Sequence, residues 1–180
     1  IPGVYAFTDA SSDPWFAPAG LIRGALGSVI RAERKLTSGN RDTLYEANVN
    51  PIATFPGSGV VVFGQKTLQK RASALDRVNV RRLLIALKSY IVQISDNLVF
   101  EQNTNATRNA FLAEVNPYLE SVQQRQGLYA FKVVMDASNN TPDVIDRNEL
   151  VGQIYLQPTK TAEFVILDFN VLPTGATFPE

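Results

Sequence analysis

The most regular pattern of hydrophobic and polar positions lies between residues 79 and 99. Apolar side chains recur there at intervals of three and four residues, which places them on one face of an α-helix. Asn79 is a good N-cap residue, and a helix of about 21 residues starting there would be about 31 Å long. Ile85, Tyr90 and Val92 lie off this face, which predicts a helix covered on more than one side. The apolar face comprises Val80, Leu83, Leu84, Leu87, Ile91, Ile94 and Leu98.

A second helix is predicted over residues 104–126. Asn103 or Thr104 provides the N-cap, and Gly127 provides the signal that stops the helix. Pro117 lies inside this segment and lacks the amide hydrogen that an interior helical residue donates. We therefore expect a kink or a break just before Pro117.

The last third of the chain contains three runs rich in β-branched and aromatic residues. They predict strands over residues 128–136, 150–158 and 162–171. The short Pro-Thr-Lys connection between the last two runs predicts an antiparallel hairpin. Over residues 164–169 of the third run, one face of the predicted strand is entirely apolar and the other is apolar except for Asp168. A strand of this kind is covered on both sides, or it lies at an interface.

The first half of the chain gives weaker signals. Prolines, glycines and aromatic residues over residues 1–27 predict a strand followed by an ordered loop. Trp15 and Phe16 within it either anchor the loop to the core or contact a partner. A short helix is predicted at residues 42–47, and a proline-bounded loop separates it from a buried strand at residues 60–63.

The stretch GVVVFGQKT, which starts at residue 59, has the outline of a phosphate-binding loop. Such a loop needs lysine directly after its second glycine, but Gln65 separates Gly64 from Lys66. The three valines and the phenylalanine before Gly64 favour an extended backbone over a turn that points successive amides at phosphate. We therefore interpret this stretch as a strand and its exit turn.

Composition narrows the range of functions. The 180 residues fit one domain, with 45% hydrophobic and 19% charged residues and a formal net charge of zero. Zero net charge argues against a general affinity for nucleic acid or anionic membranes, and no apolar run approaches the ~20 residues that cross a bilayer. The chain has no cysteine and no histidine, which removes thiolate chemistry, the Ser-His and Cys-His nucleophile systems and imidazole metal sites.

These elements together predict an α+β fold, in which a mixed or antiparallel β-sheet packs against two long helices and extended arms lie at the termini. The chain begins with Ile1, without a start methionine or a signal-peptide pattern. We therefore expect it to be part of a longer chain.

An acidic loop after the first predicted C-terminal strand invites a calcium-binding interpretation. Asp136, Ser138 and Asn140 occupy the first, third and fifth positions of an EF-hand-like loop. Thr141 and Arg147 stand where that loop needs glycine and a bidentate glutamate. We expect a solvated loop with Asx turns and neither a metal nor another cofactor.

Basic residues are concentrated between residues 66 and 82, where they face a single acid, Asp76. No aromatic residues are interleaved with them, so nucleic-acid binding is a weak interpretation. They form either a solvated surface with local ion pairs or a patch that meets an acidic face of another protein. The six residues are Lys66, Lys70, Arg71, Arg77, Arg81 and Arg82.

Nearly the whole chain resembles, in order, the C-terminal part of the contractile tail sheath protein of myophage-type bacteriophages. Sheath subunits of that family are considerably longer, and their N-terminal arm and outer domains have no counterpart here. The resemblance rests on the following segments: DPWFAPAGLIRG (13–24), NPIATFPGSGVVVFGQKTLQ (50–69), ALDRVNVRRLLIALK (74–88), FEQNT (100–104), PYLESVQQRQGLYAFKVVMD (117–136) and NNTPDVIDRNELVGQIYLQPTKTAEFVILDFNV (139–171).

The resemblance implies a structural subunit without catalytic residues, assembled in the bacterial host cytoplasm and located in the tail sheath of the virion. Such subunits stack as hexameric rings around a tail tube and contract to drive the tube through the host envelope. The implied partners are other copies of the subunit, the tail tube protein, and baseplate and tail terminator proteins. No nucleic acid and no membrane are implied.

The resemblance also implies an organisation for the chain. Residues 1–180 would form one domain, on the inner side of the sheath, and residues 160–180 a C-terminal strand or arm. In this family arms from neighbouring subunits add strands to the sheet of the domain, so the last predicted strand is the candidate interface. Its residues are Phe164, Val165, Ile166, Leu167, Asp168, Phe169, Asn170 and Val171. The six basic residues are candidates for contact with the tube or a neighbouring subunit.

Two alternatives belong to other classes of protein. One is an adaptor of the baseplate or the tube, which forms a single ring of fixed stoichiometry. The other is a hydrolase that uses the carboxylates of the acidic loop as an acid/base pair. Those carboxylates belong to Asp136, Asp143, Asp146 and Glu149.

Overall fold

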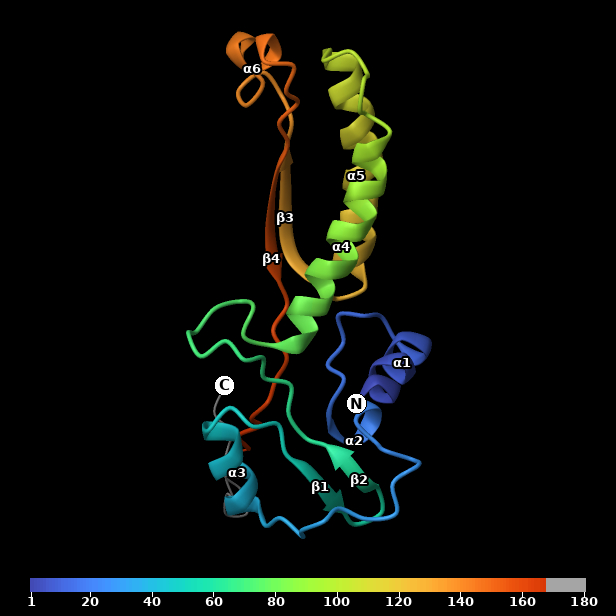
Figure 1. Ribbon diagram of the computed structural model, residues 1–180, viewed down its shortest axis with the longest axis vertical. Coiled ribbons are helices and arrows are strands. Elements are labelled where there is room, and N and C mark those ends of the chain that lie inside the picture. The colour runs from blue at the N-terminus through green and yellow to red at the C-terminus, as the bar shows by residue number, and fades with distance from the viewer. Residues whose placement is uncertain (168–180) are drawn as a thin grey trace, which may run out of the picture.

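The computed structural model describes residues 1–167, which form an elongated molecule with two halves along its longest axis (Figure 1). The helical half, residues 78–158, contains two long helices and a two-stranded antiparallel sheet. The hairpin half, residues 1–65, contains three shorter helices and a second two-stranded sheet. The α+β class and the packing of a small antiparallel sheet on two long helices agree with the sequence-based prediction.

The two long helices, α4 (Val78–Asp96) and α5 (Asn105–Gln124), lie side by side (Figure 1). The side chain of Thr104 caps α5 by accepting a hydrogen bond from the amide of Thr107, as predicted. The predicted cap of α4 is wrong, because Arg77 is the N-cap residue and Asn79 lies inside the first turn. Asn79 is buried there, and its amide donates to Oε1 of Gln65 instead.

The sequence predicts either a kink or a break just before Pro117. Helix α5 continues through Pro117, so it does not break there. Pro117 removes the helical hydrogen bond to the carbonyl of Ala113. Both residues lie on the exposed side of the helix, where solvent has access to that carbonyl. On the opposite side, Val115 and Leu119 are fully buried. Packing of this face therefore holds α5 together across the proline.

The sheet of the helical half consists of β3 (Leu128–Val134) and β4 (Gln153–Pro158). The strands pair antiparallel, with Phe131 opposite Leu156 and an irregularity between Leu128 and Ala130. One face of this sheet packs on α5, and a short helix, α6 (Pro142–Asp146), lies in the connection between the strands at the far end of the molecule (Figure 1). The buried core of this half comprises Trp15, Leu83, Leu87, Ile94, Phe111, Val115, Leu119, Val122, Leu128 and Met135.

The predicted hairpin between residues 150–158 and 162–171 does not form in the described part of the chain, and residues 168–171 of the prediction lie outside it. Strand β4 pairs with β3, and residues 159–167 form no strand. The backbone amide and the hydroxyl of Thr159 donate to the carbonyl of Gly127, and the hydroxyl also donates to that of Gln126. These bonds direct the chain away from β4, so it does not fold back along that strand.

The hairpin half is built around β1 (Ile52–Phe55) and β2 (Gly59–Val62), which pair antiparallel. Gly57 and Gly59 have φ angles of 78° and 70°, which the tight connection requires and which residues with a Cβ rarely adopt. The valines of β2 are buried, as predicted for this stretch, whereas Phe63, expected in the same buried strand, lies outside β2 and is 41% exposed. Strand β1 was missed, because the prolines on either side of it favoured a loop.

The helices of this half are α1 (Pro2–Ser11), α2 (Gly20–Arg23) and α3 (Ser38–Glu46). The strand predicted at the start of the chain is wrong. Pro2 occupies the first turn of α1, where a missing amide hydrogen costs nothing, and the two buried residues of α1, Val4 and Thr8, are one helical turn apart.

Trp15 anchors its loop to the core, the first of the two predicted roles. Its side chain is 5% exposed, and its indole N–H donates to the carbonyl of Arg125 at 2.9 Å. The N-terminal loop is thereby joined to the end of α5 in the helical half.

Candidate subunit interface

The C-terminal segment, residues 159–167, leaves β4 and runs from the helical half toward the hairpin half (Figure 1). Its first attachment is Thr159, whose hydroxyl donates to the carbonyl of Gln126 at 2.6 Å. Its second is Thr161, whose hydroxyl accepts a hydrogen bond of 2.5 Å from the side-chain amide of Gln65. The segment is therefore tied first to the helical half and then to the exit of β2.

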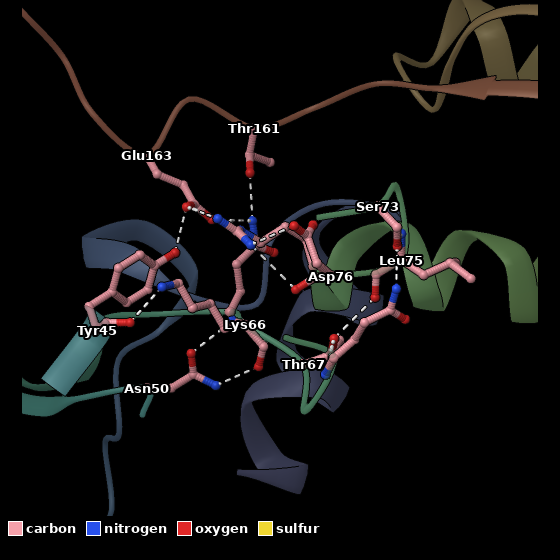
Figure 2. Close-up of polar contacts among 12 residues, drawn as sticks. Tyr45, Asn50, Lys66, Thr67, Ser73, Leu75, Asp76, Thr161 and Glu163 are labelled. Atoms are coloured by element: carbon pink, nitrogen blue, oxygen red, sulfur yellow. Dashed lines mark hydrogen bonds and ion pairs between the residues drawn. The ribbon is translucent and has the colours of Figure 1, made fainter. Parts of the chain in front are cut away.

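The third and strongest attachment is Glu163. Arg77 donates from Nε to Oε1 at 2.7 Å and from Nη2 to Oε2 at 3.0 Å, a bidentate charge-assisted pair. The hydroxyl of Tyr45 donates to Oε2 at 2.5 Å (Figure 2). The side-chain nitrogen Nε2 of Gln65 lies 3.5 Å from Oε1. We call this group, Tyr45, Gln65, Arg77 and Glu163, the Glu163 clamp.

The clamp fixes the ionisation of its members. Burial alone would raise the pKa of Glu163, but hydrogen bonds from Arg77 and Tyr45 outweigh burial and hold the pKa below the ordinary glutamate value. Burial and the neighbouring Glu163 carboxylate raise the pKa of Tyr45. Glu163 is thus an anion at neutral pH, and Tyr45 keeps the proton that it donates.

Gln65 connects three parts of the chain. Its side chain is 4% exposed, donates to Thr161 and accepts from the amide of Asn79 in the first turn of α4. This is the residue that breaks the phosphate-loop pattern in GVVVFGQKT. The structure explains its presence, because a buried amide at this position joins β2, α4 and the C-terminal segment.

Lys66, the lysine of the same stretch, is half-buried and lies against Tyr45. Its ammonium group donates to the carbonyl of Tyr45 at 2.5 Å and lies 3.9 Å from the centre of the Tyr45 ring. Asn50 accepts from the backbone amide of Lys66 at 2.7 Å and donates to its carbonyl at 2.9 Å (Figure 2). Lys66 therefore positions Tyr45 within the clamp.

Directly after the clamp, the C-terminal segment presents apolar side chains to solvent. Phe164, Val165, Ile166 and Leu167 are 75%, 76%, 93% and 70% exposed. An uninterrupted run of this kind is uncommon on an isolated subunit and is typical of a surface that another chain covers. The other four residues of the predicted interface, Asp168, Phe169, Asn170 and Val171, lie outside the described residues.

The sheet of the helical half has open edges. Within residues 1–167, β3 pairs only with β4, and β4 pairs only with β3. The outer edge of each strand therefore carries backbone N–H and C=O groups that a further strand can pair with. A sheet of two strands is also marginal by itself, so it gains from added strands.

The structure separates the six basic residues into two groups. Lys66 and Arg77 contact Tyr45 and Glu163, and Arg82 pairs with Asp9 and lies over the ring of Tyr5. Within residues 1–167, the remaining three form no ion pair and are exposed. They are Lys70, Arg71 and Arg81.

Lys70 and Arg71 belong to the basic loop, residues 66–77, which projects from the side of the molecule (Figure 1). The loop is ordered by internal hydrogen bonds. The amide of Thr67 donates to the carbonyl of Asp76 at 3.0 Å, and its hydroxyl donates to that of Leu75 at 3.1 Å. The loop therefore holds its exposed cations in a defined position.

The acidic loop forms the Asx turn that we expected. The amide and hydroxyl of Ser138 donate to the carboxylate of Asp136, and these bonds lower the pKa of Asp136. Asn140 is buried and connects the loop to Val151 through two hydrogen bonds of 2.8 Å. In the part of the chain that the structure describes, no three acidic residues are grouped as metal ligands, and no helix has the length and apolar character to span a bilayer.

The fold is that of an α+β protein with two long helices and a small antiparallel sheet. Comparison with known proteins identifies the family within this class. The family described as "Phage tail sheath C-terminal domain" matches residues 71–172. The chain belongs to this family.

Curated relatives extend the match to the whole chain. Over 180 residues, the chain is 43% identical to the tail sheath protein of Vibrio phage KVP40 and 41% identical to that of Enterobacteria phage T4. Each comparison covers 100% of this chain and 27% of the relative. The chain therefore spans about a quarter of the length of the curated relatives it matches.

Solved structures share the fold. The sheath complex of an extracellular contractile injection system, PVC, in its contracted state matches 93% of this chain and 49% of that chain, with a TM-score of 0.84 and 29% identity. The contracted helical sheath of the anti-feeding prophage matches 93% of this chain and 48% of that chain, with a TM-score of 0.83 and 28% identity. The baseplate structure of the same prophage also contains a matching chain, with a TM-score of 0.82 and 27% identity over 93% of this chain and 48% of that chain.

Proposed function

We propose that this chain is the C-terminal part of a structural subunit of a contractile phage tail sheath. The complete subunit stacks as hexameric rings around the tail tube of the virion and contracts to drive the tube through the host envelope. The observation that carries the proposal is the exposed apolar run Phe164–Leu167, which begins immediately after the Glu163 clamp. Membership of the sheath family supplies the context in which such a run joins one subunit to the next.

The C-terminal segment then acts by strand addition. Phe164–Leu167, together with residues 168–171, pairs with an open edge of the β3–β4 sheet of a neighbouring subunit. Backbone hydrogen bonds between strands provide the attachment, and the alternating apolar side chains are covered on both faces. Such a joint persists when the domains rotate as rigid bodies, because the movement occurs in the segment between them.

The basic loop and the first turn of α4 form the second contact surface. Lys70 and Arg71 of the loop and Arg81 of α4 are exposed and provide the positive charge, and Leu68 of the loop is 97% exposed. We assign these residues to contact with an acidic surface of the tail tube or of a neighbouring subunit. Lys66, Arg77 and Arg82 support this surface from within the subunit through their contacts with Tyr45, Glu163 and Asp9.

The subunit needs no catalytic residue for this function, because its work is the rearrangement of contacts between subunits. The carboxylates of the acidic loop serve local structure, as the Asx turn at Asp136 illustrates. Residues 1–180 form one domain on the inner side of the sheath, with residues 160–180 as its arm. The further partners are baseplate and tail terminator proteins, at the two ends of the polymer.

An adaptor at the baseplate is a second candidate, favoured by the matching chain in the anti-feeding prophage baseplate. An adaptor forms a single ring, whereas a sheath subunit forms open polymers. Electron microscopy of the full-length subunit distinguishes the two: sheath function predicts long tubes, and adaptor function predicts isolated rings.

The same experiment tests the role of the C-terminal segment when the subunit is compared with a variant lacking residues 164–180. This truncation keeps Glu163 and therefore the clamp. We expect the truncated subunit to remain folded and to form no tubes. Tubes of normal length and frequency from the truncated subunit would contradict the proposed function of the segment.

A further inference from the structure

Exposure of the C-terminal segment changes abruptly between two adjacent residues. The side chain of Glu163 is 18% exposed, whereas Phe164 is 75% exposed. Glu163 receives hydrogen bonds from Arg77 and Tyr45, with Gln65 at longer range. Hydrogen bonds and ion pairs therefore hold the segment up to Glu163, and none is formed from Phe164 to the last described residue. The ring of Phe164 still lies edge-on to that of Tyr45, with ring centres 6.4 Å apart.

The residues that hold Glu163 come from three separate elements. Tyr45 lies in α3, Gln65 follows β2, and Arg77 is the N-cap residue of α4. Thr159 is held by the carbonyls of Gln126 and Gly127, between α5 and β3. Residues 159–163 therefore form a strap whose two ends are attached to the two halves of the molecule.

We propose that Glu163 is a positioning residue, which fixes the point and direction at which the C-terminal arm leaves the subunit and so sets the register in which the arm pairs with a neighbour. This inference rests on the proposed function of the arm. It assigns to the clamp a role in assembly, in addition to the stability that its hydrogen bonds give to the folded chain.

The physical reason is the two-residue period of a strand. A slip of one residue in pairing moves every apolar side chain to the opposite face. Without the Glu163 clamp, the nearest attachment is Thr161, and the two residues released add about 7 Å of slack. This slack is enough for slips of one and of two residues, so the clamp is what limits the arm to one register.

A surface ion pair of similar chemistry provides a matched control. Arg147 and Glu149 pair at 2.9 Å with side chains 58% and 50% exposed, and neither holds the C-terminal segment. Glu149→Gln therefore removes the same charge as Glu163→Gln without touching the arm. Leu87→Val, in the buried face of α4, controls for a general loss of stability.

The first measurement is trypsin cleavage after Lys160 in the full-length subunit, followed by mass spectrometry. Lys160 is exposed and lies inside the strap, and cleavage requires local release of the chain around it. We expect Glu163→Gln to cleave about tenfold faster than the unmodified subunit, because hydrogen bonds to a charged group are lost. Glu149→Gln and Leu87→Val should cleave at the unmodified rate. Tyr45→Phe removes one hydrogen bond from the clamp and should show a smaller increase.

The second measurement is the regularity of the tubes in electron micrographs. We expect Glu163→Gln to give fewer tubes, and these tubes should not share a single, uniform helical repeat. Both controls should give regular tubes. Unchanged cleavage in Glu163→Gln, or regular tubes despite faster cleavage, would overturn the positioning role. The truncation that removes residues 164–180 tests the proposed function separately. If the truncated subunit still forms tubes, the C-terminal segment is not the subunit interface. That conclusion does not depend on the results for the clamp variants.

Discussion

Arg77 and Glu163, 86 residues apart in the sequence, meet in a bidentate ion pair with N–O distances of 2.7 and 3.0 Å. Arg77 starts α4, and Glu163 is the last residue of the C-terminal segment that polar contacts hold. The pair therefore links the start of α4 to the origin of the exposed C-terminal arm. Its other contacts, from Tyr45 and Gln65, place the hairpin half at the same point.

Acid should weaken this link. The pKa of Glu163 is lower in the folded chain than its ordinary value of 4.5, so the carboxylate stabilises the folded state above that pH. The contribution is lost as the pH falls through the lower folded-state pKa. We expect Glu163→Gln to lower the free energy of unfolding by about 1 kcal/mol at neutral pH, and the difference to shrink as the pH falls through the folded-state pKa of Glu163.

Differential scanning calorimetry of the two proteins across this pH range measures the effect. Other carboxylates with lowered pKa values, such as Asp136 and Glu149, lose their contributions equally in both proteins. Only the difference between the proteins reports on Glu163. A difference that stays constant from neutral to acid pH would contradict the ionised clamp.

The packing of α5 gives a prediction about stability. Leu119 is fully buried, so Leu119→Ala removes apolar contacts and leaves a cavity. The expected loss in the free energy of unfolding is about 2–5 kcal/mol, measured by urea denaturation. Leu68→Ala, at a side chain 97% exposed in the basic loop, is the matched control and should change this free energy by less than about 0.5 kcal/mol. Equal changes in the free energy of unfolding for the two substitutions would contradict the assignment of Leu119 to the buried core.

The exposed cations of the basic loop and of the first turn of α4 give a prediction about binding. The triple substitution of Lys70, Arg71 and Arg81 by glutamate should abolish co-sedimentation of the subunit with purified tail tubes at low salt, while the free energy of unfolding changes little. The unmodified subunit should bind less as salt is raised. A control with the same charge change uses exposed cations of the hairpin half, Arg31, Arg34 and Lys35. Normal binding by the loop variant, or equal loss in the control, would refute a specific contact.

The sequence pattern predicted the elements whose signal is local and repeated. The apolar face of α4 recurs over five turns, and α5 has both a capping threonine and a terminating glycine, so both helices were expected close to their observed ends. Strands β3 and β4 were recognised from their composition. The class of fold followed from these four elements.

Elements without such a signal were assigned wrongly. The start of the chain was predicted as a strand because its prolines favour extended neighbours, although the four-residue spacing of Val4 and Thr8 and the position of Pro2 are those of a helix. The partner of β4 was also wrong, since a short connection favours a hairpin locally, while the contacts of Thr159 with Gln126 and Gly127 prevent one.

The Glu163 clamp could not be predicted from the sequence, for a different reason. Tyr45, Gln65, Arg77 and Glu163 occupy four distant positions, and no spacing relates them. Arg77 was noted for its charge and Gln65 for breaking a motif, but their shared role depends on the tertiary fold that brings α3, β2 and α4 together. For the run after Glu163, by contrast, the apolar pattern predicted a strand that is covered on both sides or lies at an interface, and the resemblance to sheath proteins favoured the interface.

The central claim is that residues after Glu163 pair with the sheet of a neighbouring subunit, and cysteine cross-linking tests it most directly. This chain has no cysteine, so single cysteines can be placed at will once any others in the longer subunit are replaced. Subunits with Ile166→Cys are mixed with subunits carrying Tyr129→Cys in β3 or Tyr155→Cys in β4, assembled into tubes and oxidised. Ile30→Cys, at an equally exposed side chain of the hairpin half, is the control.

We expect disulfide-linked pairs of subunits with Tyr129→Cys or Tyr155→Cys, at a yield about tenfold above the Ile30→Cys control. The sheet edge that gives the higher yield identifies the strand that receives the arm. Background yields at both edges in well-formed tubes would contradict the claim that the C-terminal segment joins neighbouring subunits by strand addition.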